Sequence, residues 1–208
     1  PNGVNLQKFK PNSNCEDVKE KIAGKNNHII LFVGNLIPRK GLQYLIDAAK
    51  LLIKKNNQTK FVIVGDGPLK DNLISYANKE GVSKNFTFLG SVPDHKLSIY
   101  YNCADVFVSS SLQEGQGITL LEAQATATPV IAFDVSAISE VVKNKITGLL
   151  VQPDSYELAN AISDLLTDKS RREEMGNSGR EFVEKNFSLN VCAQKMSKVY
   201  HEALNLMI

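Results

Sequence analysis

The sequence predicts an α/β protein with a doubly wound parallel sheet of about six strands and helices on both faces. Short apolar runs alternate with longer amphipathic segments over most of the 208 residues, which is typical of strand–helix–strand units. The short runs are nearly continuous in apolar residues, as expected for strands that are buried on both faces. Turns with glycine follow several of these runs, and in such sheets the loops after the strands bind ligands.

The six predicted strands are the short runs rich in branched or aromatic residues. They are His28–Val33, Lys60–Val64, Phe86–Leu89, Val106–Ser109, Val130–Phe133 and Gly148–Val151. Because crossovers between parallel strands are right-handed, the carboxyl ends of these strands should meet along one edge of the sheet.

The longer segments space their apolar residues as helices do. They are Gly41–Lys55, Pro68–Glu80, Lys96–Asn102, Ile118–Ala127 and Ser155–Leu166, followed by a helical stretch beyond Asp168 that we expect to break at Gly176–Gly179 and again near Asn186–Ser188. Pro68 suits the first turn of its helix and Gly81 the C-cap, while Asp94 is the predicted N-cap of the next helix.

The composition is that of an ordinary globular domain, with 43% hydrophobic and 22% charged residues. A net charge of +2 is too small to indicate binding to nucleic acid or to an acidic membrane surface. The three cysteines and three histidines lack metal-ligand spacing, so we expect no zinc site, no disulfide framework and a reducing compartment. No apolar run reaches the length of a membrane span and no signal peptide opens the chain, which we interpret as an internal fragment of a longer protein.

The turns with glycine mark the predicted ligand edge. They are Gly34-Asn35, Gly65-Asp66-Gly67, Gly90 and Glu114-Gly115-Gln116-Gly117. The last is the most informative, because it joins a predicted strand to the start of a helix, where main-chain N–H groups can bind an anion. Its two glycines leave room for a ligand, although a flexible turn would need only one of them.

Two carboxylates belong to this region. Glu114 lies in the turn and Glu122 on the helix, with seven residues between them. Carboxylates accept hydrogen bonds from hydroxyls while helix N-termini bind phosphate, so the pair suits a ligand that carries both groups. Because apolar residues flank Glu122, its carboxylate needs a hydrogen-bond donor or a cation, and a ribose diol supplies two donors. The alternative is a surface glutamate without a partner.

Arg39 and Lys40 precede the helix that begins at Gly41. Two cations at a helix N-terminus interact unfavourably with the helix macrodipole, at a cost of about 0.3–1 kcal/mol. A phosphate bound between them would make the net interaction favourable. We therefore expect an anion there, with a solvated turn as the alternative.

Four other residues are weaker candidates. Asp134 and Glu140 follow a strand at the same edge, but a helix cap and a surface charge explain them at least as well. His95 is expected at the surface and Cys103 in the core. The sequence contains neither a Ser/His/Asp triad nor a P-loop.

The segment from Glu114 to Ala123 resembles the Glu-x7-Glu signature of retaining glycosyltransferases, family 4, also called group 1. Further matches occur in the family's order and cover nearly the whole chain: Pro1-Asn2-Gly3-Val4, Phe9-Lys10-Pro11, Phe32-Val33-Gly34 with Lys40-Gly41, Val64-Gly65-Asp66-Gly67-Pro68, Phe88-Leu89-Gly90 with Pro93-Asp94, Pro129-Val130-Ile131-Ala132, Glu140-Val141-Val142 and Thr147-Gly148-Leu149-Leu150-Val151. Most are weak singly, and the ordered set is highly specific.

The resemblance implies the Rossmann-like C-terminal half of the two-domain GT-B fold, which binds a nucleoside diphosphate sugar. It divides the chain into a lead-in segment (1–27), a donor-binding domain (28–186) and a crossover helix (187–208), with the N-terminal acceptor domain absent. Such a domain should bind the donor without useful turnover by itself, because a glycan or lipid-linked acceptor binds through the missing half.

The resemblance also implies roles for single residues. Glu114 would contact hydroxyls of the donor sugar and Lys40 would neutralise the departing diphosphate, which makes these two the catalytic candidates. Glu122 would accept hydrogen bonds from the ribose. The other donor-binding candidates are Gly34, Asn35, Arg39, Gly90, Val92, Gly115, Gly117, Ile118 and Thr119, of which 117–119 present N–H groups to the diphosphate and 90–92 border the base. No metal or cofactor is implied, since cations and the helix dipole supply the positive charge.

The sequence departs from the family's pattern at several positions. Asn35 stands where the family usually has an arginine, and Arg39 is the candidate substitute. Gln116 replaces a common aromatic residue. Ser136-Ala137 replaces a glycine pair and Thr126-Ala127-Thr128 the usual Cys-Gly. These departures concern leaving-group stabilisation and donor identity more than the fold.

The sequence thus predicts the donor-binding domain of a retaining hexosyltransferase of polysaccharide biosynthesis. Two alternatives stay open: a non-catalytic nucleotide-binding homologue or regulatory module, which Asn35 supports, and an epimerase or phosphorylase on the same fold. We expect a cytoplasmic location, with peripheral attachment of the full-length protein to the inner face of the membrane left open, and no nucleic acid partner.

Overall fold

The computed structural model describes residues 2–12, 15–54 and 58–205. These residues form one six-stranded sheet in which all neighbouring strands are parallel, in the order β3-β2-β1-β4-β5-β6. The strands are β1 (His28–Val33), β2 (Thr59–Val64), β3 (Phe86–Gly90), β4 (Val106–Ser109), β5 (Val130–Phe133) and β6 (Gly148–Val151). The predicted fold class is confirmed, and so are all six predicted strands, four of them with the predicted bounds.

Helices follow the strands as predicted, and two more were not predicted, one at the beginning of the chain and a short one between β5 and β6. They are α1 (Glu16–Ala23), α2 (Leu42–Ile53), α3 (Lys70–Lys79), α4 (Leu97–Cys103), α5 (Ile118–Ala125), α6 (Ile138–Val141), α7 (Ser155–Thr167), α8 (Lys169–Phe187) and α9 (Leu189–Asn205), with 3₁₀ turns η1 (Pro38–Lys40), η2 (Ser83–Asn85) and η3 (Asp94–Lys96).

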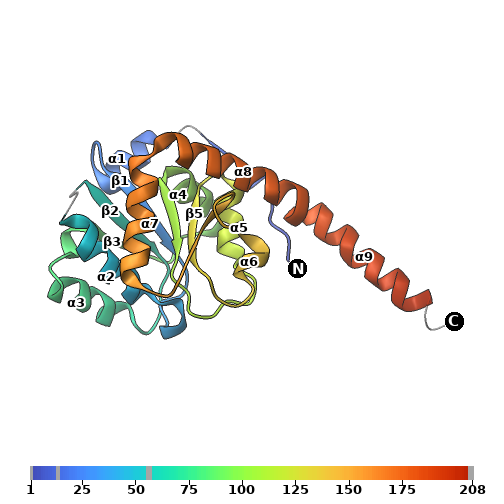
Figure 1. Ribbon diagram of the computed structural model, residues 1–208, viewed down its shortest axis with the longest axis horizontal. Helices are drawn as coiled ribbons and strands as arrows, with labels where there is room; N and C mark the ends of the chain where they lie inside the picture. The colour runs from blue at the N-terminus through green and yellow to red at the C-terminus, as the bar shows by residue number, and fades with distance from the viewer. Residues whose placement is uncertain (1, 13–14, 55–57, 206–208) are drawn as a thin grey trace.

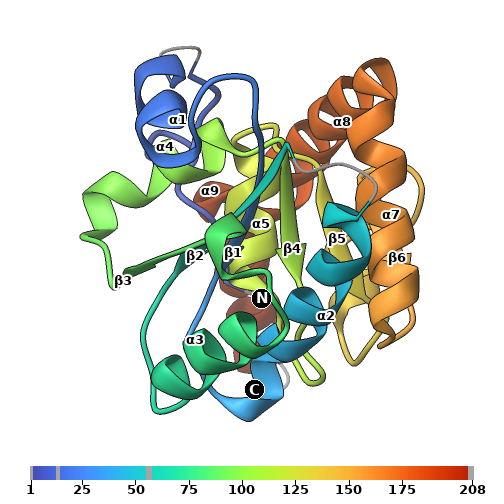
Figure 2. The ribbon, with the colours of Figure 1, turned by 90° about the vertical axis from the view of Figure 1, so that its left-hand side faces the viewer.

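The alternation of side chains along each strand builds a core on either face of the sheet. In β1, Ile30 and Phe32 point to the core covered by α2, α3 and α7, while Ile29 and Leu31 point to the core covered by α1, α4, α5 and α6. Figure 2 shows the helices on the two sides of the sheet. Burial on both faces is the reason that the strands read as continuous apolar runs.

The strand order reverses beside β1. The chain proceeds outward through β2 and β3, then returns to add β4 on the other side of β1. The loops that follow β1 and β4 therefore leave the sheet in opposite directions, and in sheets of this kind ligands bind outside the carboxyl ends of the strands at such a point. The turn with Glu114 and the loop with Lys40 both lie at this point of the sheet.

The expected break at Gly176–Gly179 was wrong, because α8 is continuous through both glycines. A Cβ on Gly176 would lie 2.1 Å from the carbonyl oxygen of Ala127, and one on Gly179 would lie 3.1 Å from Cγ of Gln124. The glycines thus allow α8 to pack closely against α5 and the turn that follows it. The second expected break is confirmed at Ser188, after which α9 extends away from the body of the domain (Figure 1).

The lead-in segment is folded onto the domain. No helix was predicted there, yet it forms α1, and Val4 and Phe9 are buried at 2% and 3% exposure. Val4 pairs with Ser188 between α8 and α9. The apolar residues of this segment are few, and they pack against core residues that lie far away in the sequence.

Three predicted helix starts differ from the structure. Asp94 caps no helix, since η3 precedes α4 and the Asp94 side chain pairs with Lys8 instead. Pro68 lies before the first turn of α3. Asp134 is not a cap either, because α6 begins after Ala137 without a side-chain cap. The predicted stop at Gly81 is confirmed, with φ at +75° directly after the C-cap of α3.

Parts of three predictions lie outside the described residues: Pro1 of the opening motif, Lys55 at the end of the first predicted helix, and residues 206–208 of the predicted crossover helix. Within the described ranges, no helix combines the length and the apolar character that crossing a membrane requires.

Candidate functional site

Main-chain contacts join the loops that follow β1, β2 and β3. The N–H of Gly34 donates to the Val64 carbonyl at 3.0 Å, and the N–H of Gly65 donates to the Gly90 carbonyl at 2.8 Å. Gly65 has φ at +135°, and a Cβ there would lie 2.0 Å from the carbonyl oxygen of Gly34. The lack of a side chain at Gly65 therefore serves the packing of two loops against each other.

The two predicted catalytic residues are in direct contact. Lys40 ends η1, and its Nζ forms an ion pair with the carboxylate of Glu114. Both side chains are largely buried, at 15% and 13% exposure. The hydroxyl of Ser111 donates to the same carboxylate at 3.3 Å. The structure thus brings together, in one charged cluster, residues that the sequence separates by 74 positions.

The pKa of Glu114 lies below its ordinary value. Burial acts to raise it, but the hydrogen bond and charge of Lys40, with smaller contributions from Ser111 and the N–H of Gly115, outweigh burial. The carboxylate is therefore ionised at neutral pH and can accept hydrogen bonds from ligand hydroxyls.

Close packing of η1 against the end of β4 positions Lys40. Gly41 has φ at +60°, and a Cβ there would lie 2.1 Å from the carbonyl oxygen of Ser110. The hydroxyl of Ser110 donates to the Lys40 carbonyl at 3.2 Å, and the N–H of Leu112 donates to the Arg39 carbonyl at 2.8 Å. A side chain at position 41 would separate these segments, so Gly41 is required for the cluster.

Glu122 of α5 forms a second cluster, with a residue of α4. The hydroxyl of Tyr101, a fully buried residue of α4, donates to its carboxylate at 2.8 Å. Burial raises the pKa of Glu122, against the hydrogen bond from Tyr101 and the charge of Lys8, which lower it; the charge of Asp94 raises it slightly. Burial, together with the Glu122 charge, also raises the pKa of Tyr101 well above its usual range. The hydrogen-bond donor that the sequence required for Glu122 is therefore a tyrosine that sequence analysis did not single out.

The N-terminus of α5 lies in sequence between Glu114 and Glu122. Its N-cap residue, Gly117, adopts a left-handed conformation with φ at +73° and provides no side-chain cap. The N–H groups of Gly117, Ile118 and Thr119 have no intrahelical acceptor, because the first turn of any helix lacks them. A Cβ on Gly115 would meet nothing within 4 Å, whereas one on Gly117 would lie 3.0 Å from Cδ1 of Leu120, so packing in the core also requires glycine at 117.

The remaining predicted residues lie around this edge. Asn35 is exposed, and Arg39 donates to the Gln113 carbonyl at 3.4 Å, beside the turn. Gly90, with φ at +70°, lies next to an ion pair between Asp66 and Lys70, whose Nζ would be 3.5 Å from a Cβ at Gly90. Lys70 is thus a further cation at the edge that sequence analysis missed.

Cys103 is buried in the core on the α5 side of the sheet, as the sequence indicated, and Val92 is partly buried against that core. His95 is exposed, as expected.

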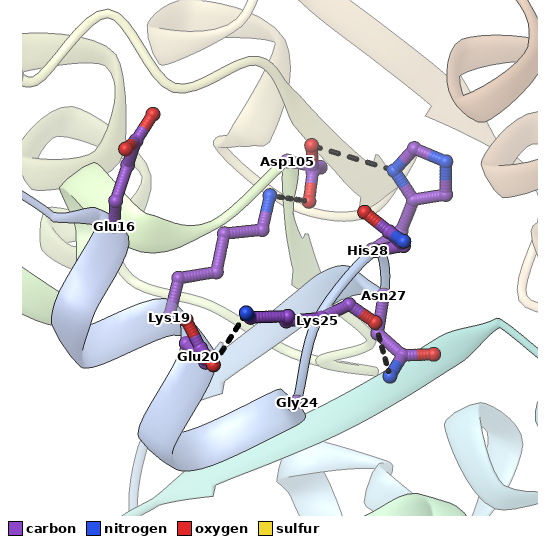
Figure 3. A pocket seen from close by; sticks show the side chains of 9 residues that line it. Glu16, Lys19, Glu20, Gly24, Lys25, Asn27, His28 and Asp105 are labelled. Atoms are coloured by element: carbon purple, nitrogen blue, oxygen red, sulfur yellow. Dashed lines mark hydrogen bonds and ion pairs between the residues drawn. The ribbon is translucent and has the colours of Figure 1, made fainter.

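A pocket of about 500 Å³ opens at the opposite edge of the sheet, where β1 and β4 begin (Figure 3). Lys19 and His28 point toward the carboxylate of Asp105, at 2.6 Å and 3.4 Å. Because Asp105 is already satisfied by protein donors, we interpret this cluster as structural. Within the part of the chain that the structure describes, no group of His, Cys, Asp or Glu side chains is arranged to hold a metal ion.

Comparison with known proteins places these features in a family. A family model described as glycosyl transferases group 1 matches residues 14–182. An uncharacterised glycosyltransferase of Methanocaldococcus jannaschii is 33% identical, with 99% of this chain and 54% of the relative covered. The UDP-Gal:α-D-GlcNAc-diphosphoundecaprenol α-1,3-galactosyltransferase of Escherichia coli is 37% identical, with 81% and 45% covered.

A solved structure of sucrose-phosphate synthase from Thermosynechococcus elongatus is 31% identical, with a TM-score of 0.87, and the alignment covers 99% of this chain and 52% of that one. The chain spans about half the length of the curated relatives it matches.

Proposed function

We propose, from the premise that this chain belongs to the group 1 glycosyl transferases, that it is the donor-binding domain of a retaining hexosyltransferase. The donor is a nucleoside diphosphate sugar, and the acceptor is a glycan or a lipid-linked glycan that binds to another part of the full-length protein. The observation that carries the proposal is the buried Lys40–Glu114 ion pair beside the uncapped N-terminus of α5.

The two clusters suit the two ends of such a donor. A diphosphate accepts hydrogen bonds from the N–H groups of 117–119 and shares the charge of Lys40, which stabilises the negative charge that grows as the sugar leaves. Glu114 accepts hydrogen bonds from sugar hydroxyls. Glu122, held by Tyr101, accepts from the ribose.

Lys40 and Lys70 supply positive charge at this edge, and Arg39 lies beside the turn. We therefore propose that transfer needs no metal ion, although Asn35 provides no charge where the family usually has an arginine. The E. coli relative is named for a UDP-linked sugar and a lipid-linked acceptor, which supports a transferase over a non-catalytic module. A cytoplasmic location stays a prediction.

Calorimetric titration of the 208-residue chain with UDP, GDP, ADP and their hexose conjugates tests the donor site. We expect one of the three series to bind. Glu122→Gln should weaken that binding about tenfold or more, because a charge-assisted hydrogen bond is lost. Glu140→Gln, a change at an exposed glutamate of α6, is the matched control and should leave affinity unchanged. A folded chain that binds none of the nucleotides would contradict the proposal.

Transfer by the full-length protein tests the finer part of the proposal. The anomeric configuration of the transferred hexose should match that of the donor, which NMR of the product measures. Inversion of the anomeric configuration would contradict the retaining mechanism. Turnover that stops when divalent metal ions are chelated would contradict the metal-independent mechanism.

A further inference from the structure

The turn Glu114–Gly117 is tied to the beginning of the described chain by one side chain, Gln116. Its Nε2 donates to the carbonyl oxygen of Asn2 at 2.7 Å, and the N–H of Asn2 donates to its Oε1 at 2.8 Å. The pair has the form of a reciprocal main-chain contact between two strands, with a primary amide in place of the second backbone. It joins positions separated by 114 residues.

The Asn2 end of this tether is firmly held. The N–H of Val4 donates to the Phe187 carbonyl at 2.8 Å, and the N–H of Leu189 donates to the Val4 carbonyl at 3.2 Å. A Cβ on Gly3 would lie 2.8 Å from Cα of Leu189, so glycine permits the close approach. Residues 2–4 are thereby fixed to the junction of α8 and α9, and they can serve as a fixed point for the turn.

The turn itself depends on side-chain tethers. The N–H of Gly115 donates to the carboxylate of its own neighbour, Glu114, at 3.3 Å. On the N-terminal side, Lys40 holds Glu114. A bound diphosphate would share the charge of Lys40, which loosens that tether when a ligand arrives. The Gln116–Asn2 pair involves no charged group, so it would hold the turn unchanged.

We propose that Gln116 is a positioning residue for the donor. Through the main chain of Asn2 it holds the turn in the conformation that directs Glu114 and the first N–H groups of α5 toward the diphosphate and the sugar. This inference rests on the proposed function and extends it. The nucleoside end of the donor is served by Glu122 and Tyr101, which the tether does not contact, so the effect of Gln116 is confined to the diphosphate end.

Binding measurements on the 208-residue chain test this role. Gln116→Met keeps the length of the side chain and removes both hydrogen bonds. We expect it to weaken the nucleoside diphosphate that the wild-type chain binds by about five- to tenfold. Affinity for the corresponding nucleoside should not change. Gln7→Met alters an exposed glutamine of the same lead-in segment and should behave as wild type.

The partner residue supplies a second, matched pair of variants. Asn2→Pro removes the N–H that Gln116 accepts from, whereas Asn2→Ala keeps both main-chain groups. Asn2→Pro should weaken the diphosphate and Asn2→Ala should not. Combining Asn2→Pro with Gln116→Met should weaken binding no more than Gln116→Met alone, because both changes act on one contact. Hydrogen exchange should be faster over residues 113–119 in each tether variant.

The outcomes separate this inference from the proposed function. A folded wild-type chain that binds no nucleoside diphosphate overturns both. A wild-type chain that binds, together with Gln116→Met of unchanged affinity, overturns the positioning role alone. Equal losses for nucleoside and diphosphate also overturn it, since they indicate general damage to the domain.

Discussion

Replacing Asp105 by asparagine should destabilise the fold without weakening nucleotide binding. Its carboxylate is 12% exposed and accepts hydrogen bonds from Lys19 at 2.6 Å and from the N–H of Ile29 at 2.8 Å. His28 approaches the other oxygen at 3.4 Å, and Arg172 of α8 lies at 3.7 Å. Asparagine has a single acceptor oxygen, so its NH₂ group must face one of these donors.

The magnitude follows from the pKa of Asp105. Burial acts to raise it, but hydrogen bonds from His28, Lys19 and Ile29, with the charge of Lys19, lower it from 3.8 to about 2. That difference corresponds to about 2 kcal/mol of stability at neutral pH. Because the folded pKa is the lower one, this contribution is present above about pH 4 and is lost as the pH falls toward 2. For a chain of this size the Tm of Asp105→Asn should fall by about 4–8 °C at pH 7.

Thermal unfolding at pH 7 and pH 3 measures both parts of the prediction. The Tm difference between wild type and Asp105→Asn should be roughly halved at pH 3, where the wild-type carboxylate has lost part of its advantage. Asp164→Asn, at an exposed aspartate of α7, is the matched control. An unchanged Tm at pH 7, a difference that does not shrink in acid, or a loss of nucleotide affinity would refute the structural role of Asp105.

Three further predictions concern the ligand edge and the packing of α8. Tyr101→Phe should weaken nucleoside diphosphate binding about three- to tenfold. Because the Tyr101 hydrogen bond lowers the pKa of Glu122, the variant should also lose binding at a higher pH than wild type as the solution is acidified, and an unchanged calorimetric pH profile would contradict this. Lys40→Met should weaken the binding of a diphosphate but not of a nucleoside, and it should raise the pKa of Glu114 and destabilise the fold, because a buried carboxylate loses its partner. Adding Glu114→Gln to Lys40→Met should restore the urea midpoint, and a double variant that stays destabilised would contradict this. Gly176→Ala should lower the free energy of unfolding by about 1–3 kcal/mol despite the better helix propensity of alanine, because a Cβ there would meet Ala127. Asn177→Ala in the same helix is the control and should be neutral. Equal urea midpoints for Gly176→Ala and wild type would contradict the prediction and show that the helix can move.

The sheet could be predicted because burial on both faces makes each strand a continuous apolar run, which can be recognised from the local sequence alone. The six runs, and the helix starts set by Gly41, Gly117 and Asp154, depend on neighbours in sequence, and Asp154 indeed accepts hydrogen bonds from Tyr156 and Glu157. Helix α1 could not be predicted in this way, because both its few apolar residues and Lys19, which pairs with Asp105, find their partners in distant parts of the sequence.

The site was only partly predictable, for the same reason. Glu114, Glu122 and Lys40 were singled out from their residue types and positions, but their immediate partners were not. Tyr101 lies in a run of apolar and aromatic residues in which a core tyrosine and a hydrogen-bond donor to Glu122 look the same. The Gly176–Gly179 pair shows the converse, since two glycines that are typical of a break instead record close packing of α8.

The geometry of the ligand edge depends on three long-range contacts that converge on α5 and the turn before it. Lys40 brings the loop after β1 to Glu114, Gln116 brings the lead-in segment, and Tyr101 brings α4 to Glu122. The same arrangement sends the pKa values of the two glutamates in opposite directions, because Glu114 has a fully charged partner while Glu122 has a neutral donor in a buried setting. Two glutamates eight positions apart thus differ in the direction of their pKa shifts because different segments of the chain pack against them. Substitutions in those segments should therefore alter donor binding even when both carboxylates are unchanged.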